Sequence, residues 1–181
     1  NGKSQLSIGG KHFNQWLLQW HASLQKMQAY YPGWHGQLIS RGFLSGSINK
    51  PKISGQATIQ NFHVGSFRSK KLAININADV PKQQISNLYI SLQDTQYKNH
   101  FASRLTLTGS GNSQKSNIKA YFANRDYTLY SLLSGKINQQ SWQGKITKLN
   151  ITSHQWGSWQ STRPADLQLA AEEINLDHFQ L

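Results

Sequence analysis

Apolar and polar residues alternate from Leu72 to Leu107, and this alternation is the clearest pattern in the chain. Apolar residues occupy every second position of three successive segments, at Leu72, Ile74, Ile76, Ala78 and Val80, then Leu88, Ile90 and Leu92, then Leu105 and Leu107. Polar residues such as Asn75, Ser91 and Thr106 stand between them. Because side chains on a strand point alternately to opposite faces, the pattern predicts sheets with one apolar and one polar face.

Strand-like segments of this kind continue almost to the end of the chain. We predict strands at 3–8, 34–40, 43–49, 53–61, 66–79, 84–93, 96–109, 114–124, 127–138, 142–152, 155–162 and 166–177. Turn-forming Asn, Asp, Gly and Pro residues separate many of them. Short connections between long strands indicate an antiparallel meander, because parallel neighbours need long crossovers. A change of parity between Ile146 and Leu149 predicts a β-bulge near Thr147 or Lys148.

Residues 13–30 have helical spacing. Apolar residues recur there at intervals of three and four, at Phe13, Trp16, Leu17, Trp20, Leu24, Met27 and Tyr31. This spacing predicts one amphipathic N-terminal helix that packs on the sheet, ended by Pro32 and Gly33. A helix on a membrane surface is the alternative, but its polar face would carry mostly Gln rather than Lys or Arg.

Composition agrees with a mostly β chain that has one apolar face per strand. Hydrophobic residues make up 37% of the 181 residues and charged residues 14%. Cysteine is absent, which excludes disulfides and thiolate metal sites. The sequence contains no run of about 18 apolar residues, so it predicts no membrane span. The net charge is +12, and no acidic residue precedes Asp79. Such a field attracts anions such as phosphate, nucleic acid or lipid headgroups, although it also serves solubility alone.

The sequence patterns of common enzymes are missing. The seven histidines lack the helical spacing of a zinc protease, and there is no Gly-x-Ser-x-Gly elbow, phosphate-binding loop or dinucleotide fingerprint. We therefore expect no enzymatic activity, cofactor or metal. A nucleic-acid platform needs aromatic and basic side chains on one shared face, whereas Ile and Leu dominate the apolar face, so no nucleic-acid partner is expected.

The apolar face needs a cover, and two arrangements provide one. A second sheet would close a β-sandwich or barrel. An open, curved sheet would instead leave a groove for an acyl chain, and exposed apolar surface of that extent generally marks a ligand or partner site. The candidate groove residues are Leu72, Ile74, Ile76, Leu88, Ile90, Leu92, Leu105, Leu107, Ile118, Phe122, Leu129, Ile151, Leu167 and Leu169. Lys70 and Lys71 are candidate contacts for anionic headgroups, and a solvated rim is the alternative.

Two blocks of sequence together resemble a known family. The first runs from Tyr31 to Leu38 and on through Gly42 to Leu44, Gly46 to Ile48, Lys50, Pro51, Ile53 to Gly55, Ala57, Ile59, Phe62, Gly65, Leu72, Ile74 and Ile76. The second contains Leu133, Gly135, Trp142 to Gly144, Ile146, Leu149, Ile151, Trp159, Pro164, Ala165 and Leu167. Their order and spacing resemble the TamB family of AsmA-like periplasmic bridge proteins over most of residues 31–181.

This resemblance implies a fold and a function. It implies that residues 1–181 are a single segment of a larger repetitive protein, with the helix at 13–30 and a taco-shaped β groove at 34–181. Such proteins are anchored in the inner membrane of Gram-negative cells and span the periplasm. The resemblance implies phospholipid transport between the membranes without enzymatic activity. It also implies a role in outer-membrane biogenesis with a TamA-like barrel partner.

Two other functions stay open. A chaperone-like groove would hold unfolded outer-membrane proteins by adding their strands to a free sheet edge, together with the TamA-like barrel. A basic nucleic-acid or polysaccharide binder is the third class, and for a nucleic acid it predicts binding that weakens steeply with salt.

Overall fold

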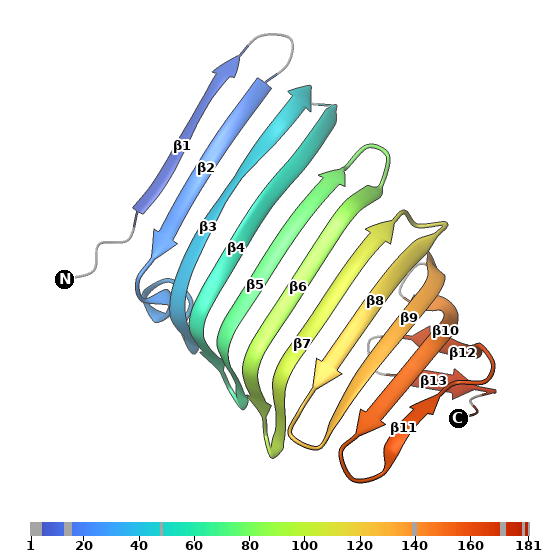
Figure 1. Cartoon of the computed structure of the whole chain (residues 1–181). Coiled ribbons are helices and arrows are strands. Elements are labelled where there is room, and N and C mark those ends of the chain that lie inside the picture. Colours follow the sequence, from blue (N-terminus) through green and yellow to red (C-terminus); the bar gives the residue numbers. More distant parts are fainter. Residues whose placement is uncertain are drawn as a thin grey trace.

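One open antiparallel sheet makes up almost all of the chain (Figure 1). The computed structural model describes residues 5–12, 16–47, 49–138, 141–170, 173–178 and 180. The described elements are β1 (Gln5–His12), β2 (Trp16–Leu24), a 3-10 turn η1 (Met27–Ala29), β3 (Trp34–Ser47), β4 (Lys50–Val64), β5 (Phe67–Asp79), β6 (Gln84–Tyr97), β7 (His100–Gly111), β8 (Ser116–Ala123), β9 (Tyr127–Asn138), β10 (Ser141–Ser153), β11 (Gly157–Gln160), β12 (Ala165–Leu169) and β13 (Ile174–Asp177). In this part of the chain, no helix is both long and apolar enough to cross a membrane.

The sheet follows the order of the sequence. From β1 to β10, each strand pairs antiparallel with the strand before it, as expected for short turns. At the far end β10 is shared: Trp142–Ile146 pairs with β12, and Asn150–Ser153 pairs with β11. The thirteen strands of the described residues form one open sheet. The prediction of a mostly β, open antiparallel meander is therefore confirmed.

The predicted α-helix at 13–30 is wrong. Residues 13–15 lie outside the described residues, 16–24 form β2, and only the 3-10 turn η1 follows. The spacing of apolar residues suggested a helix because Trp20 and Leu24 fit a helical stripe. They fit equally well the strand alternation with Leu18 and Ala22. Pairing decides the outcome, since β2 covers the backbone edge of β3 along nine residue pairs. Among the described residues, β1 and β2 thus belong to the same sheet as the strands that follow residue 34.

Several predicted strand boundaries also change. The predicted strands 34–40 and 43–49 are one continuous strand, β3, because Arg41 and Gly42 stay paired with β4. The predicted strand 166–177 is divided into β12 and β13. The bulge near Thr147 is confirmed by a register shift between Ile146 and Lys148.

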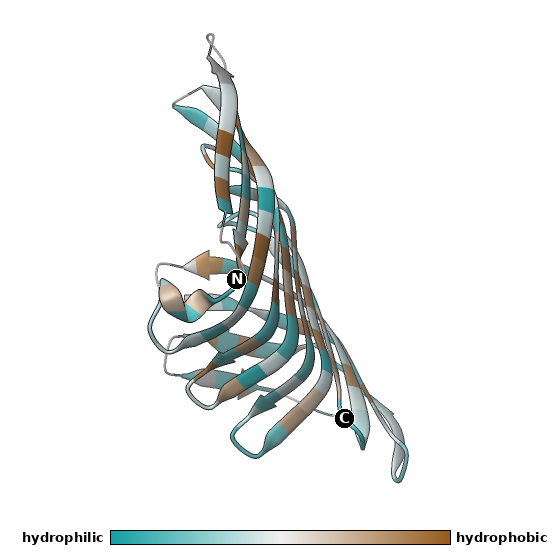
Figure 2. Cartoon of the chain, turned by 90° about the vertical axis from the view of Figure 1, so that its left-hand side faces the viewer, coloured by the Kyte–Doolittle hydropathy of each residue, from teal (hydrophilic) through white to brown (hydrophobic). Residues whose placement is uncertain are grey.

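The strand register brings apolar side chains onto one face, which we call the apolar face. One row of paired residues crosses eight strands, from β3 to β10, through Leu38, Ile59, Leu72, Leu92, Leu105, Phe122, Leu129 and Ile151. The alternate positions, such as Gln56, Asn75 and Thr108, form the opposite, polar face. The alternation of colours along the strands is visible in Figure 2.

The strands bend near one end, and the apolar face lies on the inside of the bend. Figure 2 shows the long strands curving toward the side where η1 lies. Asn61 and Asp94 have φ of 52° and 47°, the left-handed conformation that Asn and Asp tolerate better than most residues. Met27 of η1, only 3% exposed, packs on Ile59 and Phe62 inside the bend. The connection between β2 and β3 therefore folds over one end of the apolar face.

Candidate apolar groove

All fourteen candidate groove residues lie on the apolar face. Leu72, Leu92 and Leu105 belong to the row described above. A second row contains Ile74, Ile90 and Leu107. The remaining candidates continue these rows or neighbouring ones, at Ile76, Leu88, Ile118, Phe122, Leu129, Ile151, Leu167 and Leu169. Sequence alternation alone therefore placed the whole set on one side of one sheet.

This face is only partly shielded. Thirteen of the fourteen candidates keep an intermediate exposure, and only Leu167, at 9%, is buried. Two small cores lie at separate places: one joins Met27 with Ile59 and Phe62, and the other joins residues of β10 and β12. Between them, no second layer of described residues covers the strands. The apolar face is thus partly exposed between the two cores.

The most apolar hollow on this face lies between β6 and β10. It has a volume of about 410 Å³, and we call it the glycine recess. Its apolar walls come from Ile85, Leu88, Ile118, Ile137 and Trp142. Gly109 lies between Leu88 and Ile118 in the strand register and leaves the space that a side chain would occupy. Only Leu88 and Ile118 were expected from the sequence, because the recess depends on how a glycine is aligned with its neighbours.

Trp142 is held flat across the sheet in this recess. Its indole Nε1 donates a hydrogen bond to Ser116 Oγ at 2.8 Å, and that hydroxyl donates to the Gly135 carbonyl oxygen at 3.0 Å. The indole covers Gly135 and Gly144, where any Cβ atom would collide with the ring. Two glycines on paired strands therefore make room for one tryptophan.

The same arrangement occurs at the other end of the sheet. Trp20 Nε1 donates to Ser40 Oγ at 3.1 Å, and its ring covers Gly42 and Gly55 on β3 and β4. Each indole has its one polar group satisfied, as a half-buried tryptophan requires. The repetition shows that the Trp, Ser and paired-Gly combination is a way of fixing a flat ring on the apolar face.

A second hollow lies beyond the bend, where β7 and β8 meet the turns. Its volume is about 820 Å³, and Leu92, Leu105 and Phe122 form part of its apolar wall. Phe122 stacks on Tyr127 with 5.5 Å between ring centroids. Arg125 also lines this hollow, together with His100 and Asp126. No sequence pattern indicated Arg125, because only the fold brings the turn after β8 beside the apolar wall.

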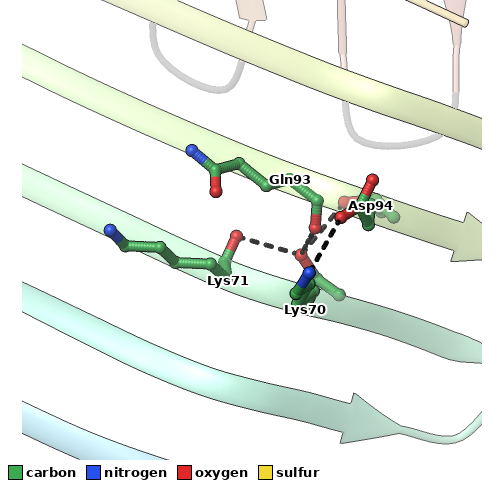
Figure 3. A network of polar contacts seen from close by, with 6 residues as sticks. Lys70, Lys71, Gln93 and Asp94 are labelled. Carbon is green, nitrogen blue, oxygen red and sulfur yellow. Dashed lines mark hydrogen bonds and ion pairs between the residues drawn. The ribbon is translucent and has the colours of Figure 1, made fainter.

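The two candidate headgroup lysines lie at the bend (Figure 3). Lys70 Nζ is 3.7 Å from Asp94 Oδ2, and both side chains are exposed. The neighbouring Ser69 hydroxyl lies 3.1 Å and 3.0 Å from the carbonyl oxygens of Lys71 and Gln93, and 3.0 Å from Thr95 Oγ1. Lys71 belongs to the row of the polar face that pairs with Gln93. Neither lysine lines the hollows of the apolar face, and their contact with headgroups stays a prediction.

Within the described ranges, no three His, Asp or Glu side chains gather as metal ligands. The two hollows described above have largely apolar walls and few charged lining residues.

The comparisons with known proteins give one match. The family model described as TamB, N-terminal domain, matches residues 1–178. No curated protein and no solved structure matches the chain.

Proposed function

Since the chain belongs to the TamB family, we propose that it is a segment of an apolar conduit for phospholipid acyl chains. The conduit would lie in the periplasm of a Gram-negative cell, in a larger protein anchored in the inner membrane. It would carry lipid between the two membranes and so support outer-membrane biogenesis. The observation that supports this proposal most strongly is the apolar row that crosses eight strands with no covering layer in the part of the chain that the structure describes.

The energetics of acyl transfer favour a surface of this kind. Each methylene exposed to water costs about 0.8 kcal/mol, so a sixteen-carbon tail costs about 12 kcal/mol. Strands lie about 4.8 Å apart, and the row from Leu38 to Ile151 therefore offers a path of roughly 34 Å. Continuous contact along this path removes most of the free-energy cost of exposing the acyl chain to water at every step. The lining needs no catalytic residue for this.

Photo-crosslinking in cells tests the proposal. A crosslinking residue at Ile76 or Ile90, on the apolar face, should capture phospholipid. The same residue at Asn77 or Tyr89, the adjacent positions on the polar face, should capture far less. Co-purified phospholipid in native mass spectrometry of the chain gives a second readout. Failure to obtain lipid adducts from any apolar position would overturn the proposal.

One observation favours a second function. Among the described residues, β1 pairs only with β2, and its Leu6 and Ile8 are 68% and 67% exposed. A strand edge of this kind can accept a strand of an unfolded outer-membrane protein, in cooperation with a TamA-like barrel. Crosslinks from Leu6 or Ile8 to such proteins, without lipid adducts from Ile76, would support this chaperone-like function over the conduit.

A further inference from the structure

The polar face carries a hollow of its own across β2 to β6. Its volume is about 580 Å³, and we call it the amide hollow. Two adjacent rows of side chains line it: one contains Gln19, Phe43, Ser54, Asn77 and Asn87, and the other Arg41, Gln56 and Asn75. The side chains of these two rows belong to the face opposite Trp20, and Gly42, Gly55 and Ile76 line the hollow between the rows.

Apart from Gln56, the side-chain amides in this hollow are not engaged by other described residues of the protein itself. The side chains of Gln19, Asn75, Asn77 and Asn87 form no hydrogen bond with any other described residue. Each amide offers two N–H donors and a carbonyl acceptor. The contrast is the Ser69 hydroxyl at the bend, which is surrounded by three protein acceptors. The hollow therefore presents an array of donors and acceptors to a ligand rather than to the protein.

Among the described residues that line the hollow, Arg41 is the one charged group. When the Gln56 side-chain amide is oriented with its oxygen toward Arg41, that oxygen accepts hydrogen bonds from Arg41 Nε and Nη2, and the Nη1 N–H groups stay available to a ligand. No carboxylate of the described ranges lines the hollow. Asp79, on the next row, is already paired with Lys52 and Lys82, at 3.9 Å and 3.6 Å. The hollow thus favours a ligand that carries a negative charge.

Phe43 supplies an apolar platform among these polar groups. Its side chain is 45% exposed although it lies on the polar face. Closely spaced amides, one guanidinium and one exposed ring complement a sugar ring, which has hydroxyls around its edge and C–H groups on its faces. A single cation is too little for a nucleic-acid backbone, which requires several neutralised phosphates. A peptide strand has no free backbone partner here, because both edges of β3 to β5 are already paired.

We propose that the amide hollow binds an oligosaccharide that carries a carboxylate. Arg41 binds the carboxylate, the free amides bind hydroxyl or acetamido groups, and Phe43 lies against a ring face. At about 30 Å³ for each water-sized group, the hollow holds roughly 19 such groups, enough for between one and two sugar rings. This site is independent of the lipid conduit, so either proposal can fail without the other.

Titration of the chain with two defined probes tests the site. The first probe is the disaccharide of N-acetylglucosamine and N-acetylmuramic acid, which carries a carboxylate, and the second is neutral di-N-acetylchitobiose. Shifts of side-chain amide signals in nuclear magnetic resonance report binding at the hollow. We expect Arg41→Gln to weaken binding of the acidic disaccharide about tenfold or more and to change chitobiose binding little. Asn77→Ala should weaken binding of both probes.

Matched substitutions outside the hollow serve as controls. Arg104→Gln and Asn117→Ala change the same residue types on the polar face of β7 and β8, and we expect neither to alter binding. Thermal unfolding of each variant confirms that the sheet is intact. Equal losses in Arg41→Gln and Arg104→Gln would overturn the proposal, since they indicate general charge attraction. Inorganic phosphate or anionic vesicles that compete for the site as strongly as the disaccharide does would also overturn it. The absence of any shift of the amide signals at millimolar sugar would do the same.

Discussion

Replacing Gly109 by leucine fills the glycine recess with little disturbance of the backbone. A Cβ atom built on Gly109 lies 3.9 Å from the nearest neighbours, the carbonyl oxygen of Asn117 and Leu88 Cβ, which is ordinary contact. Its backbone is not in the left-handed region that restricts other glycines of this chain. Glycine inside a strand is unfavourable by roughly 0.5–1 kcal/mol, so the variant should be as stable as the parent or slightly more stable.

The expected loss of lipid contact follows from the volume of the recess. At about 30 Å³ for each water-sized group, 410 Å³ holds roughly 14 methylene-sized groups. A leucine side chain occupies the space of about four of them. At about 0.8 kcal/mol for each methylene, the acyl chain loses about 3 kcal/mol of contact, or roughly 150-fold in local affinity.

Trp142 provides a local assay because its indole lines the same recess. A lysophospholipid with a brominated acyl chain should quench its fluorescence. The Trp142 contribution is the difference between the chain and its Trp142→Phe variant. We expect Gly109→Leu to need roughly 150-fold more lipid for half of that quenching.

Gly9→Leu is the matched control. Gly9 lies on β1 at a position of the polar face, paired with Gln19, and no atom lies within 4 Å of a Cβ built there. The same leucine should leave Trp142 quenching unchanged. If Gly109→Leu and the parent chain are quenched at the same lipid concentration, acyl chains do not enter the recess and the reasoning fails.

Two further predictions concern the bend. Asn61→Val should lower the free energy of unfolding by about 1–2 kcal/mol, because a β-branched residue is disfavoured at φ of 52°, while Asn61→Gly should be tolerated. Urea unfolding of both variants, with Gln60→Val as the control, checks this prediction. Equal stability of the two Asn61 variants would contradict it. Met27→Ala should lower the free energy of unfolding by about 2–5 kcal/mol, since Met27 is only 3% exposed and packs against Ile59 and Phe62. Met27→Leu should lower it by less than about 1.5 kcal/mol. An unchanged unfolding midpoint for Met27→Ala would show that η1 does not contribute to stability.

The alternation of side chains was enough to predict the sheet and the membership of its apolar face. Residues such as Ile74 and Ile90 are paired because each strand follows the one before it and each turn is short. The parity change at Ile146 likewise located a bulge correctly. These features depend on neighbours in the sequence, which is why sequence reasoning reaches them.

Features that depend on register were out of reach. The glycine recess exists because Gly109 is aligned with Leu88 and Ile118, and the amide hollow exists because β2 to β6 align amides in rows. The segment around Trp20 fits both periods, and only pairing with β3 decides for a strand. The bend depends on left-handed Asn61 and Asp94, whose effect on the direction of a strand is invisible in hydropathy.

The sequential pairing of β1 to β10 also bears on how such a molecule is assembled and how it can vary in length. Because each strand contacts mainly its two neighbours, stability accumulates locally, as it does in repeat proteins. A hairpin can therefore fold onto the preceding strand as soon as both are available, with no distant segment to wait for. Insertion or removal of one hairpin changes the span by roughly 10 Å and leaves the remaining strands in register. Elongation by whole hairpins is thus a simple way to lengthen the conduit proposed above.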